Sequence, residues 1–366
     1  MNKILALPKF IADGIGYHLT GPVFEEMPRM IMFVVTRRCN SKCIMCHSWK
    51  QTSSEGELTI DEIREIFSDP FFRKVESVII SGGEPSLRSD LPEIISTIQK
   101  SCPRLKYIWA SSNGLNPGML EKRVMAIIDA MDSDKVHQLT YNISIDGIGD
   151  THDKIRGIKG GYERSMESID ILNKIRKEYP INVSINTVIQ PDNLSELNEI
   201  KLVAAEKGVQ AVFSPLVDDA FFASENVASK MAFNEDELKK FKDFIVNTYN
   251  GALNTTGLFW SRYLSMLDGG GRWMPCGFER FALVLEPTGD LRVCTMRDWT
   301  SVGNIKGKSA AEAGIAKKSK EVKSRLRKEV CPDCPNYCTT DFALEKEFFV
   351  YAAYLFKKRL LKLFNK

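Results

Sequence analysis

The sequence predicts an α/β protein whose strands are mostly parallel. The first observation is an alternation: in the first two thirds of the chain, short apolar runs are separated by amphipathic helical stretches. Such alternation is typical of parallel strands joined by crossover helices. The second observation is that glycine-rich and polar motifs follow the apolar runs, and sites in such folds form at the carboxyl ends of the strands. Periodicity alone fits a barrel as well as an open, doubly wound sheet.

Six strands are expected from the apolar runs. They lie at residues 30–36, 77–81, 106–111, 138–145, 181–189 and 210–216. The amphipathic stretches favour helices at residues 60–67, 91–99, 119–131, 162–179 and 194–207. Beyond the last strand we expect a linker or lid at residues 217–234, a bridging helix at 235–249 and a flexible joint at 268–271.

Composition narrows the class of protein. The chain has 366 residues, of which 43% are hydrophobic, so it can bury a full core and a second, smaller unit. Its 50 basic and 47 acidic residues nearly cancel, which argues against nucleic acid as a partner. The nine cysteines are clustered and no signal peptide opens the chain, so a reducing cytoplasm is expected. No apolar stretch reaches the roughly 18 residues that span a bilayer.

Three cysteines follow the first expected strand in the pattern C-x3-C-x2-C: Cys39, Cys43 and Cys46. Three thiolates this close together can hold three irons of a [4Fe–4S] cluster and leave the fourth iron without a protein ligand. Zinc is an alternative, but it usually takes four ligands and only His47 lies near enough to be the fourth. The spacing also fits a disulfide with one spare thiol, or reduced cysteines without a role.

The second expected strand ends in Ser81-Gly82-Gly83-Glu84-Pro85. Two glycines at a strand end let the backbone approach a ligand closely, and the glutamate places an acceptor beside it. With the cysteine triplet before it, this segment resembles the radical S-adenosylmethionine (radical SAM) superfamily. The resemblance implies a partial (β/α)6 TIM-like barrel and a [4Fe–4S] cluster that binds SAM.

The same resemblance implies which residues bind SAM. Gly82, Gly83 and Glu84 take the role of the family's Gly-Gly-Glu segment, which binds the SAM amino group. The residue before the third cysteine is usually aromatic in the family and packs near the adenine, whereas here it is Met45. A polarisable thioether can fill the same space, so we expect SAM binding to persist.

The fourth expected strand leads into Ser144-Ile145-Asp146-Gly147, followed by His152-Asp153 and Arg156-Gly157. The glycines alone fit a turn and a loop that closes onto a helix. The segment also resembles radical SAM enzymes that carry a SPASM or Twitch auxiliary domain, in which the serine and the arginine lie near SAM. Ser144 and Arg156 are therefore candidates for its ribose or carboxylate, and an arginine fork suits a carboxylate.

Two asparagines occupy further contact positions of that family. Asn113 precedes Gly114 after the third expected strand, and Asn186 lies on the fifth. The alternative is local, because an asparagine at a strand end is more often a turn former than a ligand.

The last third holds a second group of cysteines: Cys276-x12-Gly289-x4-Cys294, then Cys331-x2-Cys334-x3-Cys338. Apolar runs at 281–285 and 291–293 flank the glycine and predict a β-hairpin that turns there. The arrangement resembles the opening of a SPASM or Twitch domain, although full SPASM domains have seven cysteines and two clusters. The five present imply one auxiliary [4Fe–4S] cluster held by four of them. A zinc ribbon is the alternative, and Cys102, in a loop before Pro103, is expected to be structural.

These expectations define five segments: residues 1–29 (amphipathic extension), 30–217 (radical SAM core barrel), 218–271 (linker and bridging helix), 272–341 (SPASM/Twitch-like auxiliary cluster domain) and 342–366 (basic amphipathic helix). Between Phe348 and Lys366, aromatic and aliphatic residues at helical spacing accompany five cations, a pattern that suits an anionic membrane surface or a partner protein. The alternative is that both terminal helices cover the barrel or a dimer interface. We thus expect a cytoplasmic protein, with peripheral contact to the inner membrane face left open.

The resemblance implies a mechanism in which the reduced cluster, supplied by a flavodoxin- or ferredoxin-type reductant, cleaves SAM to methionine and a 5′-deoxyadenosyl radical. That radical removes a hydrogen atom from an unactivated C–H bond, and the cofactor carries the difficult chemistry. The auxiliary cluster would accept an electron from the substrate, giving net oxidation or cross-linking, or would orient the substrate. No acid or base is chosen from among Asp218, Asp219, Glu279 and Asp290.

The substrate class stays open. Relatives with SPASM domains often modify peptides or protein side chains, and we take this as the first expectation. The 29 residues before the first strand are too few for a leader-recognition domain, which weakens the peptide assignment. A sugar, aminocyclitol or lipid-linked small molecule is the alternative, and a non-catalytic iron–sulfur or zinc scaffold is a remote one.

Overall fold

The computed structural model describes residues 27–132, 136–218, 231–272, 276–336, 339–340, 343 and 351–356. Its contacts divide the chain into two compact units. The core unit comprises Met27–Phe233 and Ala282–Val322, and the second unit comprises Met1–Glu26, Asn234–Phe281 and Lys323–Lys366. The five segment boundaries suggested by the sequence stay a prediction.

The core unit is built on one nine-stranded sheet in the order β6-β5-β4-β3-β2-β1-β7-β8-β9. Six of its strands are those expected from the sequence, with ends that differ by at most two residues: β1 (Met30–Val34), β2 (Ser77–Ser81), β3 (Tyr107–Ser112), β4 (Gln138–Ser144), β5 (Ile181–Ile189) and β6 (Gln210–Pro215). Each pairs with its neighbours in parallel. The sheet is curved but not closed, since β6 and β9 remain its two edges.

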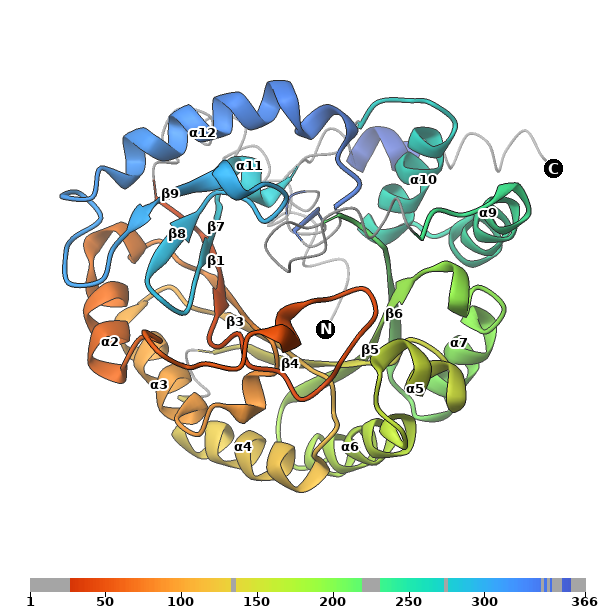
Figure 1. Cartoon of the computed structure of the whole chain (residues 1–366), viewed down its shortest axis with the longest axis horizontal. Coiled ribbons are helices and arrows are strands. Elements are labelled where there is room, and N and C mark those ends of the chain that lie inside the picture. The colour runs from red at the N-terminus through yellow and green to blue at the C-terminus, as the bar shows by residue number, and fades with distance from the viewer. Residues whose placement is uncertain are drawn as a thin grey trace. The chain divides into compact units, whose positions relative to one another are not determined.

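Helices cover the outer face of the curved sheet (Figure 1). The five expected helices are present as α2 (Ile60–Ser68), α3 (Leu91–Ser101), α4 (Pro117–Ala130), α6 (Gly161–Ile175) and α7 (Leu197–Glu206). Their starts are set locally: Thr59 and Glu62 form a reciprocal capping box at α2, and Asn116 caps α4. A short helix, α5 (Asp150–Arg156), lies where the sequence suggested a turn and a loop.

Strand β1 is apolar and buried on both faces of the sheet. All five residues of β1 are buried, as expected for a parallel strand covered on both sides. The Phe33 ring of β1 lies 5.9 Å from Phe67 of α2, and Phe67 lies 5.5 Å from Phe72. This packing fixes β1, and with it the start of the loop that carries the first three cysteines.

The predicted hairpin is present, as β7 (Ala282–Leu285) and β8 (Asp290–Arg292), which pair in antiparallel fashion. Gly289 adopts a left-handed φ of 91° at the turn. The hairpin also extends the core sheet, because β7 pairs in parallel with β1 and β8 pairs with β9 (Ser301–Asn304). The apolar pattern predicts the hairpin but carries no information about which distant strand it joins.

The second unit is helical in its described residues. The expected bridging helix is α9 (Glu235–Tyr249), and α10 (Thr255–Leu267) and α11 (Gly277–Arg280) follow it. Helix α12 (Ile315–Glu329) begins in the core unit and ends in the second unit.

Short 3-10 turns are also present among the described residues: η1 (Ser48–Lys50), η2 (Pro70–Phe72), η3 (Pro85–Leu87), η4 (Pro191–Asn193), η6 (Asp298–Thr300) and η7 (Cys331–Asp333).

Part of the expected C-terminal helix is described, at residues 351–356. Two of its tyrosine hydroxyls donate to the chain that connects α9 and α10: Tyr351 to the Leu253 carbonyl and Tyr354 to the Ala252 carbonyl, both at 2.7 Å. These bonds support packing of this stretch within the second unit. Residues 357–366, with their basic side chains, and residues 1–26 of the expected amphipathic extension lie outside the described residues. No described helix has the length and apolar character needed to cross a bilayer.

Candidate active site

The first three cysteines lie on the loop between β1 and α2, here called the cluster loop (residues 35–47). Its first residues prolong the pairing of β1 with β2 beyond the strand ends. The Val35 amide donates to the Ser81 carbonyl at 2.9 Å, and the Gly83 amide donates to the Thr36 carbonyl at 2.9 Å. The Glu84 amide then donates to the Arg38 carbonyl at 2.8 Å, one residue before Cys39. The Gly-Gly-Glu segment therefore holds the cluster loop through its backbone.

This close approach explains why glycines stand at both positions. A Cβ at residue 82 would lie 2.5 Å from the Thr36 carbonyl oxygen, and Gly82 also has a φ of 156°. A Cβ at residue 83 would collide with the Arg38 carbonyl. The sequence predicts a close backbone approach here, and in the described structure the partner of that approach is the cluster loop.

Glu84 is buried at the junction of β2 and β3. Its carboxylate accepts hydrogen bonds from the Ser112 hydroxyl at 2.9 Å, the Asn113 amide at 2.7 Å and the Ser86 amide at 3.1 Å. Burial raises the pKa of Glu84, and these donors oppose the shift. The side chain thus ties two strand ends together, a role that sequence reasoning did not assign to it.

Asn113 connects the end of β3 to the cluster loop. Its side-chain amide donates to the Asn40 side-chain oxygen at 2.7 Å and lies 3.9 Å from the Cys39 sulfur. Its side-chain oxygen accepts from the Leu115 amide at 3.0 Å, as a turn-forming asparagine does. The Leu115 contact fits the turn-forming interpretation, and the predicted contact of Asn113 with SAM stays a prediction.

Arg156, at the end of α5, contacts the cluster loop with its backbone and its side chain. Its carbonyl accepts from the Lys42 amide and from the Ser41 hydroxyl, both at 2.9 Å. Its guanidinium Nη1 lies 3.7 Å from the Cys43 sulfur, and Nη2 lies 2.5 Å from the Asp146 carboxylate. Burial opposes the charge of Arg156, but Asp146 and Cys43 raise its pKa. Removing one partner of such a buried pair typically costs about 3–5 kcal/mol.

Asp146 and His152 belong to the same buried group of side chains as Arg156, and both are completely buried. Burial raises the pKa of Asp146 while Arg156 opposes the rise, and the Val188 amide also donates to the carboxylate at 2.8 Å. Burial lowers the pKa of His152 to about 3, so its imidazole is neutral at physiological pH. Its Nδ1 accepts from the Asp146 amide at 3.2 Å. Both residues were quoted in the sequence motif, but no role was assigned to them there.

The remaining predicted SAM contacts are two strand residues and one residue of the cluster loop. Ser144 ends β4 and is paired with Asn186 of β5, and both are half-buried. Asn186 lies within β5 and not at its end. Met45 is half-buried on the cluster loop. The roles of these residues stay predictions.

The thiols of the cluster loop suit a [4Fe–4S] cluster with three protein ligands. None of the three forms a disulfide, and burial raises the pKa of Cys39 to about 12, with the charges of Glu84, Cys43 and Cys46 adding to the rise. Burial also raises the pKa of Cys46, where the Arg156 charge acts in the opposite direction. No three His, Cys, Asp or Glu side chains of the described residues gather around one point. In a cubane cluster each iron takes its own thiolate, so the three sulfur atoms do not have to surround a single metal position.

Three of the second-unit cysteines are also neighbours. Cys276 and Cys334 both raise the pKa of Cys331, which burial brings to about 12. Arg272 holds their segment, donating to the carbonyls of Cys334 at 2.5 Å and Asn336 at 3.0 Å. Their role as cluster ligands stays a prediction.

The other predicted ligands are placed differently. Cys294 follows β8 in the core unit and accepts from the Met296 amide at 3.5 Å, whereas Cys338 lies outside the described residues. Cys102 is buried after α3, in keeping with a structural role.

The acid and base candidates are largely occupied. Glu279 pairs with Arg327 at 2.7 Å, and Asp290 accepts from the Thr288 hydroxyl at 2.8 Å. Asp218 is half-buried, and Asp219 lies outside the described residues.

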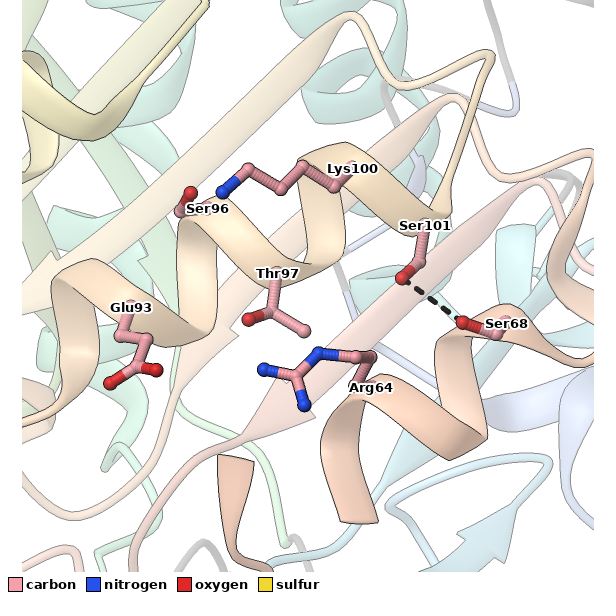
Figure 2. Close-up of a pocket in the computed structure, with 7 residues that line it drawn as sticks. All are labelled: Arg64, Ser68, Glu93, Ser96, Thr97, Lys100 and Ser101. Atoms are coloured by element: carbon pink, nitrogen blue, oxygen red, sulfur yellow. Dashed lines mark hydrogen bonds between the residues drawn. The ribbon is translucent and has the colours of Figure 1, made fainter. Parts of the chain in front are cut away.

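A surface pocket lies elsewhere, between α2 and α3 (Figure 2). It is lined by Arg64, Ser68, Glu93, Ser96, Thr97, Lys100 and Ser101. None of these residues belongs to the motifs above, so the pocket is separate from the candidate site.

Comparisons to known proteins bear on the family and on the fold. Residues 33–203 match the Radical SAM superfamily, so this stretch of the chain is a radical SAM domain. The cofactors of that family are a [4Fe–4S] cluster and SAM, which the cluster loop fits as described above. The chain is 30% identical to pre-heme d1 synthase of Dinoroseobacter shibae over 54% of this chain and 46% of that protein. It is 24% identical to mycofactocin maturase MftC of Mycolicibacterium smegmatis over 76% of this chain and 68% of that protein.

Solved structures share the fold over a longer stretch. The protein anSMEcpe with bound AdoMet has a TM-score of 0.60 at 17% identity, covering 92% of this chain and 99% of that one. Streptococcus suis SuiB bound to the precursor peptide SuiA has a TM-score of 0.56 at 12% identity, covering 85% and 70%. These likenesses concern the fold alone. The chain spans about half the length of the first curated relatives it matches.

Two glycines near Arg156 provide a matched test of the cluster loop. Gly157 and Gly160 both have a φ of 67°, so alanine at either position costs about 1–2 kcal/mol of backbone strain. Only at residue 157 would the Cβ meet the loop, 2.5 Å from the Lys42 carbonyl oxygen, while residue 160 faces open space. We predict that Gly157→Ala loses most of the iron bound by the N-terminal cysteines and that Gly160→Ala retains it.

Iron per chain after anaerobic reconstitution checks this, with the Cys39, Cys43 and Cys46 triple alanine variant as the baseline. Equal iron in the two glycine variants would contradict the contact.

Buried His152 predicts a pH dependence of stability. Its pKa is lower in the folded protein than the unfolded value near 6.5, so it stabilises the fold above pH 6.5 and that stability is lost as the pH falls towards 3. His152→Asn keeps an acceptor for the Asp146 amide without a titrating group. Between pH 7 and 5.5 the parent should lose about 1 kcal/mol more than the variant, at about 1.4 kcal/mol per pKa unit. Urea unfolding at both pH values measures these free energies of unfolding. Equal losses in the parent and in His152→Asn would show that His152 is not buried in its neutral form.

Proposed function

We propose that this radical SAM enzyme reductively cleaves SAM and uses the 5′-deoxyadenosyl radical to remove a hydrogen atom from an unactivated C–H bond. The observation that carries the proposal is the convergence on one loop: the Gly-Gly-Glu segment follows β2, Asn113 follows β3 and Arg156 ends α5, and each contacts the chain around Cys39 or Cys43. When bound, the reduced cluster supplies the electron that SAM cleavage requires.

The residues of this chain have positioning roles in the proposal. The backbone of Gly83 and Glu84 holds the cluster loop in register with β2, and Asn113 and Arg156 hold it from β3 and α5. Gly82, Gly83 and Glu84 are proposed to bind the SAM amino group, Met45 to lie near the adenine, and Ser144 and Asn186 to contact the cofactor. The reductant is proposed to be a flavodoxin- or ferredoxin-type protein.

For the substrate, we propose a peptide or protein side chain that undergoes oxidation or cross-linking. Support comes from two names: SuiB was solved with a precursor peptide and MftC is a maturase. A small molecule is the second candidate, since other relatives are named for heme d1, heme and coproporphyrin synthesis. This second class of substrate includes sugars, aminocyclitols and lipid-linked molecules. A peripheral membrane or partner-protein contact through the C-terminal helix is also part of the proposal.

An auxiliary [4Fe–4S] cluster of the SPASM or Twitch type is part of the proposal. It would be held by four of Cys276, Cys294, Cys331, Cys334 and Cys338 and would take up the electron that net oxidation releases. The mutual proximity of Cys276, Cys331 and Cys334 supports it.

We predict that the dithionite-reduced protein converts SAM to 5′-deoxyadenosine. Glu84→Gln should weaken SAM binding at least tenfold, about 1.4 kcal/mol, while iron content stays unchanged. Glutamine is preferred to alanine because it keeps the shape of the side chain and one acceptor oxygen, whereas Ser112 and Asn113 donate to the two different oxygens of the carboxylate. Chromatography of the products and equilibrium SAM binding are the measurements. Intact clusters that never cleave SAM, with candidate peptides or porphyrins present, would favour the non-catalytic scaffold.

The auxiliary cluster predicts an iron count. Protein reconstituted without oxygen should hold about eight irons, and alanine at Cys39, Cys43 and Cys46 should leave about four. Alanine at Cys276, Cys331 and Cys334 should also leave about four, with SAM still bound by the N-terminal site. Stoichiometric zinc in the second unit would replace this proposal with a zinc ribbon.

A further inference from the structure

Arg156 does more in the described structure than the sequence assigned to it. The sequence suggested a contact with the SAM ribose or carboxylate, but the guanidinium is engaged with the protein through both Nη atoms. Nη1 lies 3.7 Å from the Cys43 sulfur and Nη2 lies 2.5 Å from the Asp146 carboxylate. Arg156 is only 9% exposed, so water screens its charge weakly.

The position of this charge is fixed by three secondary structure elements. Asp146, after β4, is held by the Val188 amide of β5 at 2.8 Å, and its carbonyl accepts from the Asn193 side chain at 3.0 Å. The backbone of α5 is bonded to the cluster loop through the Lys42 amide, and the Ile44 amide donates to the Ile155 carbonyl at 2.9 Å. Arg156 and Cys43 therefore cannot move apart without breaking backbone hydrogen bonds.

The charges around Cys43 determine the sign of the electrostatic effect that Arg156 has on the thiolates. His152, the other basic group in this buried cluster, is neutral at physiological pH. Arg156 also acts on Cys46, so its cation influences two of the three thiolates. Reduction adds one negative charge to a cluster held by these thiolates, and a nearby buried cation stabilises the reduced state more than the oxidised one.

We propose that the Arg156–Asp146 pair sets the reduction potential of the SAM-binding cluster through Cys43. Arg156 is a positioning residue here, because it acts on the cluster through a ligand, and Asp146 holds it in place. The cationic guanidinium raises the potential and so makes the cluster easier to reduce, while the carboxylate of Asp146 limits that rise. The inference requires the family's cluster but not the proposed substrate or the auxiliary cluster.

The test is an EPR-monitored redox titration of the full-length protein without SAM. The signal of the N-terminal cluster is identified beforehand as the one that SAM perturbs. Arg156→Gln should lower the midpoint potential, reducing the equilibrium constant for reduction at least tenfold, which is about 59 mV for one electron. Arg156→Lys, which keeps the charge, should retain most of the potential. Asp146→Asn removes a negative charge and should shift the potential in the opposite direction.

Each outcome decides the proposal. A lowered potential in Arg156→Gln with a raised potential in Asp146→Asn supports it. An unchanged potential in Arg156→Gln, together with weaker SAM binding, overturns it and makes Arg156 a SAM ligand. If Arg156→Gln fails to hold iron, Asp146→Asn and Arg156→Lys decide: a raised potential in Asp146→Asn with a near-parental one in Arg156→Lys supports the proposal, and any other pair of values overturns it. A loss of SAM cleavage with the predicted potential shifts would count against the proposed function and not against this inference.

Discussion

The cluster loop contains no helix or strand of its own, and the short turn η1 begins only after it. Its shape therefore depends on hydrogen bonds from other segments. The prolonged pairing with the Gly-Gly-Glu segment supplies one side of this support, and the carbonyl of Arg156 supplies the other. Both supports require close backbone contact, which is why Gly82, Gly83 and Gly157 stand where a Cβ would collide. The shape of the site therefore rests on the backbone of its surroundings.

The buried charges of the site have polar partners. Glu84 accepts hydrogen bonds from its own turn and from the residue after β3, whereas Asp146 forms an ion pair with Arg156. Buried polar groups are costly unless they are satisfied, so these networks hold each strand end in one arrangement. The same arrangement places a cation beside Cys43 and a side-chain amide near Cys39. Structural support and electrostatic influence on the cysteines thus come from the same residues.

The core sheet extends beyond the six strands of a partial barrel. Strand β7 pairs with β1, the strand that leads into the cluster loop, and Glu286 at its end forms an ion pair with Arg37 of that loop at 2.5 Å. A segment that follows the barrel only after α9, α10 and α11 is therefore joined to its first strand. This joint gives the C-terminal part of the core unit a direct structural connection to the candidate site.

The sequence by itself determined the class of fold, the six strands, the hairpin and the motifs, because apolar periodicity and glycine placement are local properties. It also indicated the family, since the cysteine spacing and the Gly-Gly-Glu segment are short patterns. Only the tertiary structure decided what these residues contact: the glycines meet the cluster loop, Glu84 joins two strand ends, and Arg156 lies between Asp146 and Cys43. The pairing of β7 with β1 was likewise decided by tertiary structure. Such contacts join residues far apart in the chain, and local patterns do not encode which distant partner a buried group meets.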